Sequence, residues 1–267
     1  MHMLEGATQK IIIRMVLESA SRVNVKQKTR KLETALESKL RRIFIQHGNA
    51  FLKRFAKHKL VFKEAAADEQ TSFVDALFDN TSQHDNMAAT IQSAVEDAVS
   101  VGANTLIEQF DADIVFSLKN PRAVEYLDNY GADLVTKIDE FSKQLLRNAI
   151  ARAIEQGQSY QKVSKTIGQM FSDWSQQRAK LIAVTEIGNA YQEGNLIVGK
   201  DLSASGIVIE KSWLTRGDTK VDPHCVANAD QGWIDVNKPF ASGVERPLDH
   251  PRCRCVMLMK RVSNVNS

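Results

Sequence analysis

The sequence predicts an α+β fold, in which a long-helix N-terminal body precedes a small α+β C-terminal module with a few short strands. Three observations support this prediction. Apolar residues recur at helical spacing over roughly the first 170 residues, β-branched and turn-forming residues gather after Gly206, and all three cysteines lie in the last 43 residues. We therefore expect a helical body over residues 1–172, with a basic and then an acidic segment, a module over 173–262 and a disordered tail over 263–267.

The helical body divides into segments that each carry an apolar face. Pro121 is expected to end one long helix and to open the next, because proline lacks the amide hydrogen that a helix interior needs. We expect a bend at Gly48, a hinge at Gly131 and an N-cap at Asp173. The predicted helices span residues 7–24, 28–59, 83–119, 121–129, 132–155, 159–171 and 173–198.

The module differs from the body in residue composition and hydrophobic pattern. Residues 207–214 are β-branched and partly alternate in polarity, so they predict a strand, and residues 256–259 predict another. Trp213 and Trp233 are expected to supply core area to a segment that is otherwise poor in large side chains. The module should therefore be a compact unit around a small sheet.

Charge is segregated along the body. Residues 26–63 include twelve lysines and arginines and two acids, whereas residues 64–140 include sixteen acids and three lysines and arginines. One interpretation is a basic face that binds an anionic polymer such as DNA through non-specific phosphate contacts, or that docks on an acidic protein. The other is that the two segments pack on each other. The candidate residues for contact with DNA or a partner are Arg41, Arg42, Lys53, Arg54, Lys57 and Lys59.

The N-terminal residues lack the succession of a signal peptide, and no window approaches an uninterrupted apolar span. We therefore expect a cytosolic protein that does not enter a membrane. Three cysteines, an odd number in a reducing compartment, argue against a disulfide framework.

An ordered set of residues in the last third resembles the phage Mu protein F-like domain of minor head, or head morphogenesis, proteins of tailed bacteriophages. The set comprises Arg178, Thr185, Glu186, Asn189, Gly194, Lys211, Trp213, Asp218, Val221, Pro223, Cys225, Pro239, Phe240 and the run from His250 to Cys255. The resemblance implies a virion protein of the phage head, present in few copies near the portal and in the host cytoplasm during assembly. It implies a role in procapsid assembly and in DNA packaging or retention, with portal, capsid or scaffold proteins as partners.

Cys225, His250, Cys253 and Cys255 form two clusters about 25 residues apart, a spacing found in structural zinc sites. Asp222 or His224 is a candidate additional ligand, and Asp222 stands where the resemblance would place a first cysteine. If residues 253–259 form a strand, Cys253 and Cys255 point to opposite faces and do not easily bind one ion. Two interpretations stay open. The set holds a structural zinc ion, the single candidate cofactor, or buried thiols and a hydrogen-bonded His250 fasten the last strand. In both, Cys225 and His250 share one core.

An enzyme is the alternative from another class. It would be a metal-dependent nuclease using Asp218, His224 and His250, or a toxin-like effector joined to the phage domain. Asp218 and Asp230 are typical of turns, where an aspartate bonds locally. A third alternative is a non-specific DNA-binding protein. We favour a non-enzymatic structural and assembly role and assign no catalytic residue.

Overall fold

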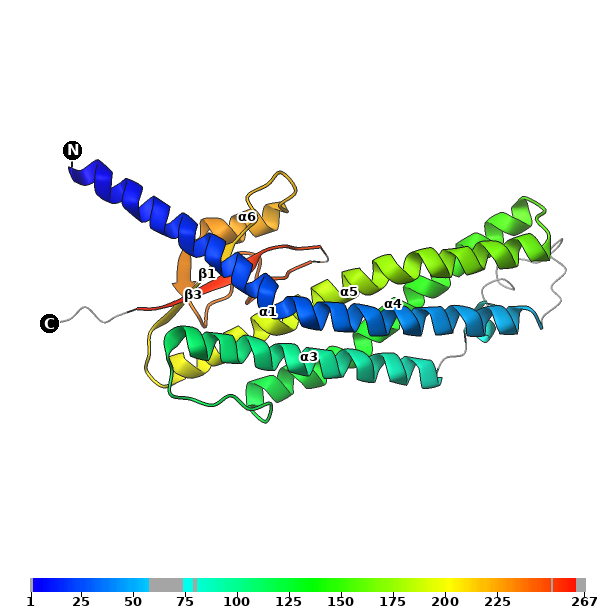
Figure 1. Cartoon of the computed structure of the whole chain (residues 1–267), viewed down its shortest axis with the longest axis horizontal. Helices are drawn as coiled ribbons and strands as arrows, with labels where there is room; N and C mark the ends of the chain where they lie inside the picture. The colour runs from blue at the N-terminus through cyan, green and yellow to red at the C-terminus, as the bar shows by residue number, and fades with distance from the viewer. Residues whose placement is uncertain (1, 58–73, 79–80, 251, 263–267) are drawn as a thin grey trace. The chain divides into compact units, whose positions relative to one another are not determined.

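The computed structural model describes residues 2–57, 74–78, 81–250 and 252–262, and it confirms the α+β class. Long helices make up the body and a small sheet lies near the C-terminus (Figure 1). The elements are α1 His2–Phe55, α3 Thr81–Phe110, α4 Pro121–Glu155, α5 Tyr160–Ala204, β1 Ile209–Leu214, α6 Pro223–Asp230, β2 Trp233–Asp235 and β3 Val256–Arg261. Among the described helices, none combines the length and apolar character needed to span a bilayer.

Three pairs of predicted helices are single helices in the structure, so the predicted breaks were wrong. The segments 7–24 and 28–59 join in α1, because no glycine or proline separates them. Gly131 lies inside α4, since one glycine costs a helix interior only about 1 kcal/mol. Asp173 lies inside α5 and accepts a hydrogen bond from the Gln169 side chain instead of capping a helix.

Helix α3 ends at Phe110, well before the predicted end at residue 119. Asp111 adopts the left-handed conformation, with φ of 48°. Its amide donates to the carbonyl of Glu108 at 3.3 Å, and the amide of Ala112 donates to the carbonyl of Ile107 at 3.1 Å. This pair of bonds is the Schellman arrangement, which satisfies the last carbonyls of a helix. Aspartate substitutes for the usual glycine because its short polar side chain tolerates this conformation.

The chain forms two compact units that are each discontinuous in sequence. One comprises Thr34–Ser93 and Tyr126–Ile182, and the other comprises Met1–Glu33, Ala94–Glu125 and Ala183–Ser267. The boundary proposed at residue 172 stays a prediction, and the predicted tail over 263–267 lies outside the described residues.

The first unit is a helical assembly with an aromatic core. The rings of Phe51 and Phe55 stack at 6.1 Å between centroids, and Phe55 stacks on Tyr160 at 4.7 Å. Phe44, Phe51 and Phe55 are buried, so the phenylalanines of the basic helix face a core, while Arg41, Arg42 and Lys53 are exposed. The core is completed by Val74, Leu77, Phe78, Leu146, Ile150, Ala153, Val163, Ile167 and Phe171.

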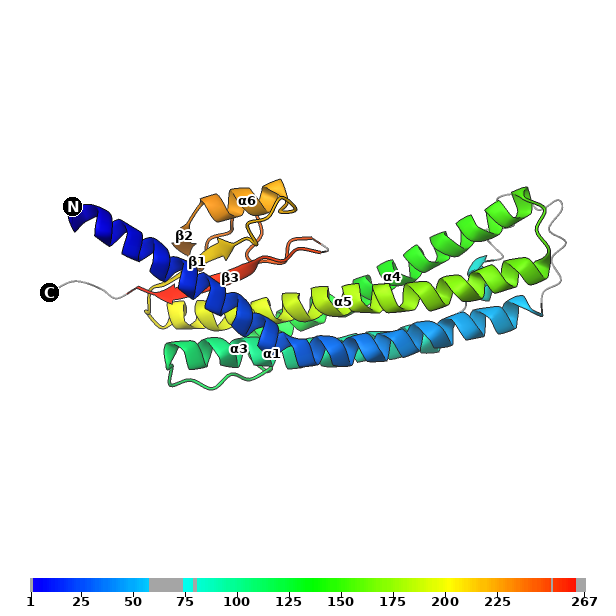
Figure 2. The ribbon, with the colours of Figure 1, turned by 45° about the horizontal axis from the view of Figure 1, so that its top comes forward.

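The second unit contains the three-stranded antiparallel sheet, in the order β2-β1-β3. The register pairs Lys211 with Ile234 on one side and with Met259 on the other. Figure 2 shows the sheet between the C-terminal part of α5 and helix α6. The core on the α5 side includes Leu196, Leu202, Ile209, Val236, Met257 and Met259. The strands predicted at 207–214 and 256–259 are thus confirmed as β1 and β3.

Two glycines allow α3 and α5 to meet backbone against backbone in this unit. A Cβ atom added at Gly102 would lie 2.0 Å from the carbonyl oxygen of Tyr191, and one added at Gly194 would lie 2.0 Å from that of Val99. No side chain fits at these two positions without separating the helices. Gly194, one of the residues of the ordered set, therefore has a packing role.

Candidate metal centre

The start of α6 places Cys225 toward the core. Asp222 is the N-cap, in an extended conformation, and its carboxylate accepts a hydrogen bond from the amide of His224 at 2.9 Å. Pro223 follows at the first position of the helix, where its missing amide hydrogen costs nothing. Cys225 is then buried, with 1% of its surface exposed, while the preceding His224 is exposed.

The second cluster lies in a turn that ends before β3. The amide of Cys253 donates to the carbonyl of His250 at 3.0 Å, and Arg252 has a φ of 68°. Strand β3 begins at Val256, which pairs with Leu214. The expectation that Cys253 and Cys255 alternate across a strand was therefore wrong, because both residues precede the first ladder pair. The side chains of Cys253 and Cys255 are therefore not constrained to opposite faces of a strand.

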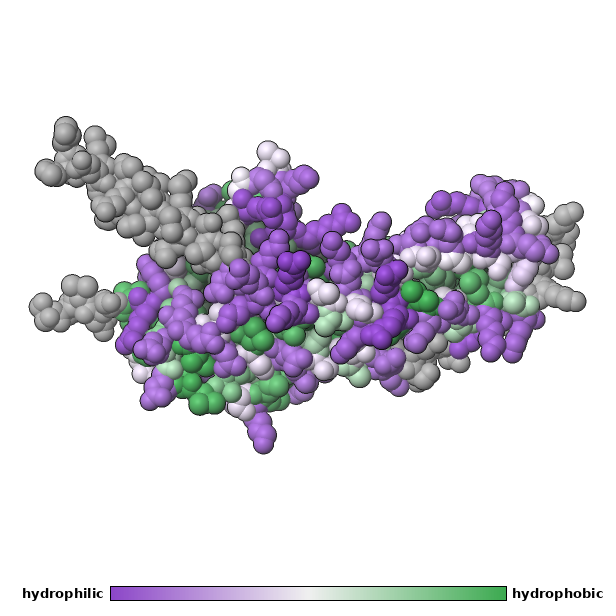
Figure 3. Space-filling model, in the orientation of Figure 1, coloured by the Kyte–Doolittle hydropathy of each residue, from purple (hydrophilic) through white to green (hydrophobic). Residues whose placement is uncertain are grey.

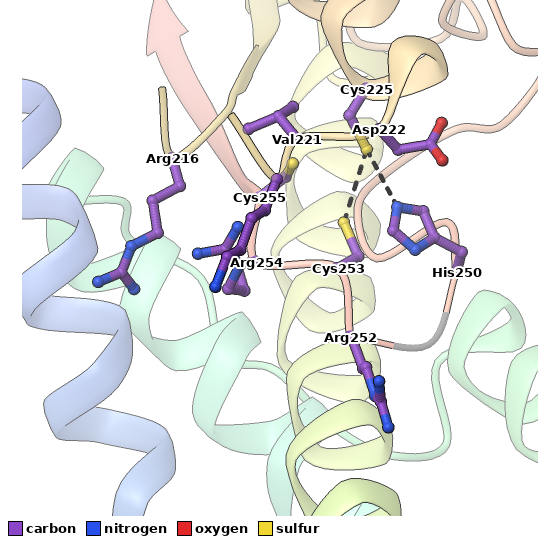
Figure 4. Close-up of a pocket in the computed structure, with 10 residues that line it drawn as sticks. Arg216, Val221, Asp222, Cys225, His250, Arg252, Cys253, Arg254 and Cys255 are labelled. Atoms are coloured by element: carbon purple, nitrogen blue, oxygen red, sulfur yellow. Dashed lines mark hydrogen bonds between the residues drawn. The ribbon is translucent and has the colours of Figure 1, made fainter. Parts of the chain in front are cut away.

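The structure brings the predicted residues together. Cys225 Sγ lies 3.7 Å from Cys253 Sγ and 3.5 Å from His250 Nε2. The three sulfur atoms lie within 4.8 Å of one another, and all three cysteines are buried and not disulfide-bonded. Figure 4 shows the sulfurs of Cys225 and Cys253 and the ring of His250 facing one another, whereas the Asp222 carboxylate points away from the Cys225 sulfur. The expectation that Cys225 and His250 share one core is confirmed.

An apolar shell surrounds the cluster. Trp213 and Phe240 pack edge to face at 5.0 Å between centroids, against the three cysteines. Trp213 is thus a core residue, as predicted. The same prediction was wrong for Trp233, which is 38% exposed, because β2 is an edge strand and the ring lies over Lys260 Nζ at 4.5 Å.

A cationic rim borders the cluster. Arg216, Lys220, Arg252 and Arg254 line the same small cavity as the cysteines and His250. This rim was not predicted, although two arginines alternate with cysteines between positions 252 and 255 of the sequence. Positive charge close to a cysteine favours the thiolate, which is the form that binds a metal.

The thiols of the cluster differ in acidity. A hydrogen bond from Cys255 holds the pKa of Cys253 at about 5, well below its usual range. Burial raises the pKa of Cys225 to about 11, and the bond to Cys253 raises that of Cys255. The arrangement therefore favours one thiolate that accepts hydrogen bonds from two thiols.

Asp218 forms a bidentate ion pair with Arg254 of the cationic rim. Its two carboxylate oxygens accept hydrogen bonds from Arg254 Nη1 and Nη2 at 2.6 and 2.7 Å. These bonds lower the pKa of Asp218 to about 2. A carboxylate held in this way is an ion-pair partner and a poor proton acceptor near neutral pH.

A buried lysine lies in the centre of the sheet. Lys211 Nζ donates to the carbonyl of Glu245 at 2.8 Å and lies 5.1 Å from the centroid of the Phe240 ring. Burial lowers its pKa to about 8. The next residue, Arg246, bonds to Glu193 and to Asn189 of α5. These contacts fix the segment at 245–246 to both the sheet and the helix.

The basic contact residues of α1 belong to the other unit. Arg41, Arg42, Lys53 and Lys57 are exposed, and Figure 3 shows strongly hydrophilic residues along the part of α1 visible in this view. Arg54 is half-buried and donates to the carbonyl of Leu77 at 3.0 Å. The predicted contact residue Lys59 lies outside the described residues. The exposed cations are available to an anionic surface.

These features define a small α+β module, built on an antiparallel sheet and centred on a thiol and imidazole cluster. Residues 144–258 match the family model of phage Mu protein F like protein, which agrees with the resemblance of the last third of the chain. The family suggests a phage head morphogenesis protein associated with the virion. Searches of curated proteins and of solved structures gave no match.

Proposed function

We propose that this protein is a minor head protein that acts in procapsid assembly and in DNA packaging or retention near the portal. The observation that carries the proposal is the match of residues 144–258 to phage Mu protein F like protein. The matched segment includes β1, β2, α6, the start of β3 and the cysteine cluster, which has a buried core around Trp213 and Phe240. An assembly role requires a stable surface rather than a reactive one.

The contacts inside the module support this role. Asp218, the first candidate for catalysis, is held by Arg254. Asn189 of α5 accepts hydrogen bonds from Arg246 and from the amide of Leu248, so the segment before the cluster is anchored at several points. A rigid surface of this kind loses little conformational entropy when it binds a partner, which favours docking.

The proposal is tested by co-expressing the chain with the portal protein of the phage that encodes it and isolating the complex through a tag on the portal. We expect the chain to be captured with portal, and a truncated chain without residues 205–267 to be lost from the complex. A chain that neither portal nor capsid protein retains would overturn the proposal. Incubation with plasmid and Mg²⁺, Mn²⁺ or Zn²⁺ tests the rival nuclease, whose cleavage would have to disappear in His224→Ala.

Contact with DNA is a second candidate function, favoured by the exposed cations Arg41, Arg42, Lys53 and Lys57. A shallow hollow of about 210 Å³ lies beside one of them, Arg42, and is lined by Lys39, Arg42, Ile43, Gln46, Asn86 and Thr90. Such a surface would contact phosphates without reading bases, which suits a protein that handles a whole genome.

A further inference from the structure

We propose that Cys225, Cys253, Cys255 and His250 bind one zinc ion as a structural centre that joins α6 to the turn before β3. The inference stands on the geometry of the cluster and does not depend on the proposed function. It selects among the candidate ligands by assigning the fourth position to His250 and excluding Asp222 and His224.

Two distances within the cluster match those of a tetrahedral zinc site. Zinc bonds to thiolate sulfur at about 2.3 Å and to imidazole nitrogen at about 2.0 Å. At tetrahedral angles, two sulfur ligands then lie about 3.8 Å apart, and a sulfur and a nitrogen lie about 3.5 Å apart. The observed separations are 3.7 Å between Cys225 Sγ and Cys253 Sγ, and 3.5 Å between Cys225 Sγ and His250 Nε2. A disulfide would require about 2.05 Å between sulfurs.

A small cavity lies beside the ligands. The cavity that the three cysteines and His250 line has a volume of about 10 Å³, which corresponds to one water-sized sphere. The third sulfur, that of Cys255, lies within 4.8 Å of the other two. His250 Nε2 contacts Cys225 Sγ and is not one of the three grouped atoms, so the imidazole must move toward Cys253 and Cys255 for all four donors to bind one ion.

The chemistry of the donors selects zinc over hard cations. Three sulfurs and one imidazole suit zinc, whereas calcium and magnesium require oxygen ligands. The Asp222 carboxylate is used as the cap of α6. Four protein ligands leave no open position for water, so the site is structural and not catalytic.

The electrostatic surroundings suit such a centre. Three thiolates and one zinc ion carry a net charge of about −1. Arg216 and Lys220 border the cavity and offset part of this charge, while Arg254 is shared with Asp218. The turn that holds Arg252 at positive φ places its exposed side chain away from the sulfurs (Figure 4). Metal binding would therefore bury little unbalanced charge.

The test starts with the full chain purified without chelators. We expect elemental analysis to find about one zinc per chain, and Co²⁺ exchanged into the site to show the visible absorption of tetrahedral cobalt with thiolate charge transfer. The variants Cys225→Ser, Cys253→Ser, Cys255→Ser and His250→Ala should each weaken binding by roughly 100-fold or more, beyond the loss caused by outer-shell changes. The matched control, His224→Ala, alters an exposed histidine beside the cluster and should bind normally.

A second measurement uses the unaltered chain, because a ligand variant that fails to fold gives no spectrum. Titration with a mercurial in the presence of a zinc-sensitive dye should release zinc in step with thiol modification. Absence of zinc after purification and of a cobalt spectrum after reconstitution would overturn the proposal. So would full binding in His250→Ala, or an intact-mass result showing Cys225 and Cys253 oxidised to a disulfide in the freshly isolated protein.

Discussion

Replacing Gly194 by alanine is expected to force α3 and α5 apart and to destabilise the unit that contains the module. The added Cβ would lie 2.0 Å from the Val99 carbonyl oxygen and 2.7 Å from the Ala103 amide nitrogen, whereas ordinary contact begins at 3.4 Å. The helices would have to separate by about 1.4 Å, the difference between 3.4 and 2.0 Å. No rotamer change relieves this clash, because both atoms belong to the backbone.

The magnitude follows from two opposing effects. Overpacking of a tight contact costs about 1–3 kcal/mol and occasionally more. Alanine recovers about 1 kcal/mol of helix propensity relative to glycine. Since the clash at Gly194 is with backbone, we expect the upper end of the cost and a net loss of about 2 kcal/mol in the free energy of unfolding.

Urea unfolding followed by circular dichroism measures this loss. The matched control is Gly168→Ala on the same helix, where the added Cβ would lie 3.4 Å from Leu52 Cδ1, an ordinary contact. That variant should be as stable as the parent, or more stable by up to about 1 kcal/mol. If Gly194→Ala behaved like Gly168→Ala, the close approach of α3 and α5 would be refuted.

Three further predictions follow from charged groups. Burial lowers the pKa of Lys211 to about 8, so the unfolded state binds more protons than the folded state between pH 8 and 10.5. Urea titrations should therefore show the parent gaining up to about 3 kcal/mol of stability relative to Lys211→Met over this pH range. A stability difference that does not change with pH would contradict the burial effect. Burial raises the pKa of Glu186 to about 7, so stability changes with pH in the opposite direction, because the folded state favours the protonated carboxyl. The parent should therefore lose stability relative to Glu186→Gln between pH 4.5 and 7 and show a constant difference above pH 7. For DNA binding measured by fluorescence anisotropy, the double variant Arg41→Glu and Arg42→Glu should reduce the slope of log affinity against log salt by about 2. The control Lys238→Glu should leave the slope unchanged. A slope unaffected by the double variant would exclude this surface as the DNA-binding surface.

The sequence predicted those parts of the structure that local pattern determines. The burial of Phe51 and Phe55 follows from helical spacing, and the two strands follow from β-branched composition. The meeting of Cys225 with His250 was predicted from the two clusters of metal-binding residue types, and it holds at 3.5 Å. In each case, a short-range signal and the long-range packing agree.

Other parts depend on contacts that local pattern does not encode. Gly131 was expected to form a hinge but lies inside α4. The turn at Arg252 delays β3 to Val256, which overturned the alternation argument for Cys253 and Cys255. Helix α6 has only eight residues, too few for a periodic apolar pattern to identify it. The role of Gly194 becomes visible only when α3 lies against it.

The most direct test of the account is quantitative mass spectrometry of purified procapsids from the phage that encodes this chain. We expect the chain in procapsids at a copy number comparable to portal and far below that of the major capsid protein. We also expect particles made without residues 205–267 to lack the protein. Procapsids that assemble and package DNA normally while containing none of this chain would contradict its role as a minor head protein.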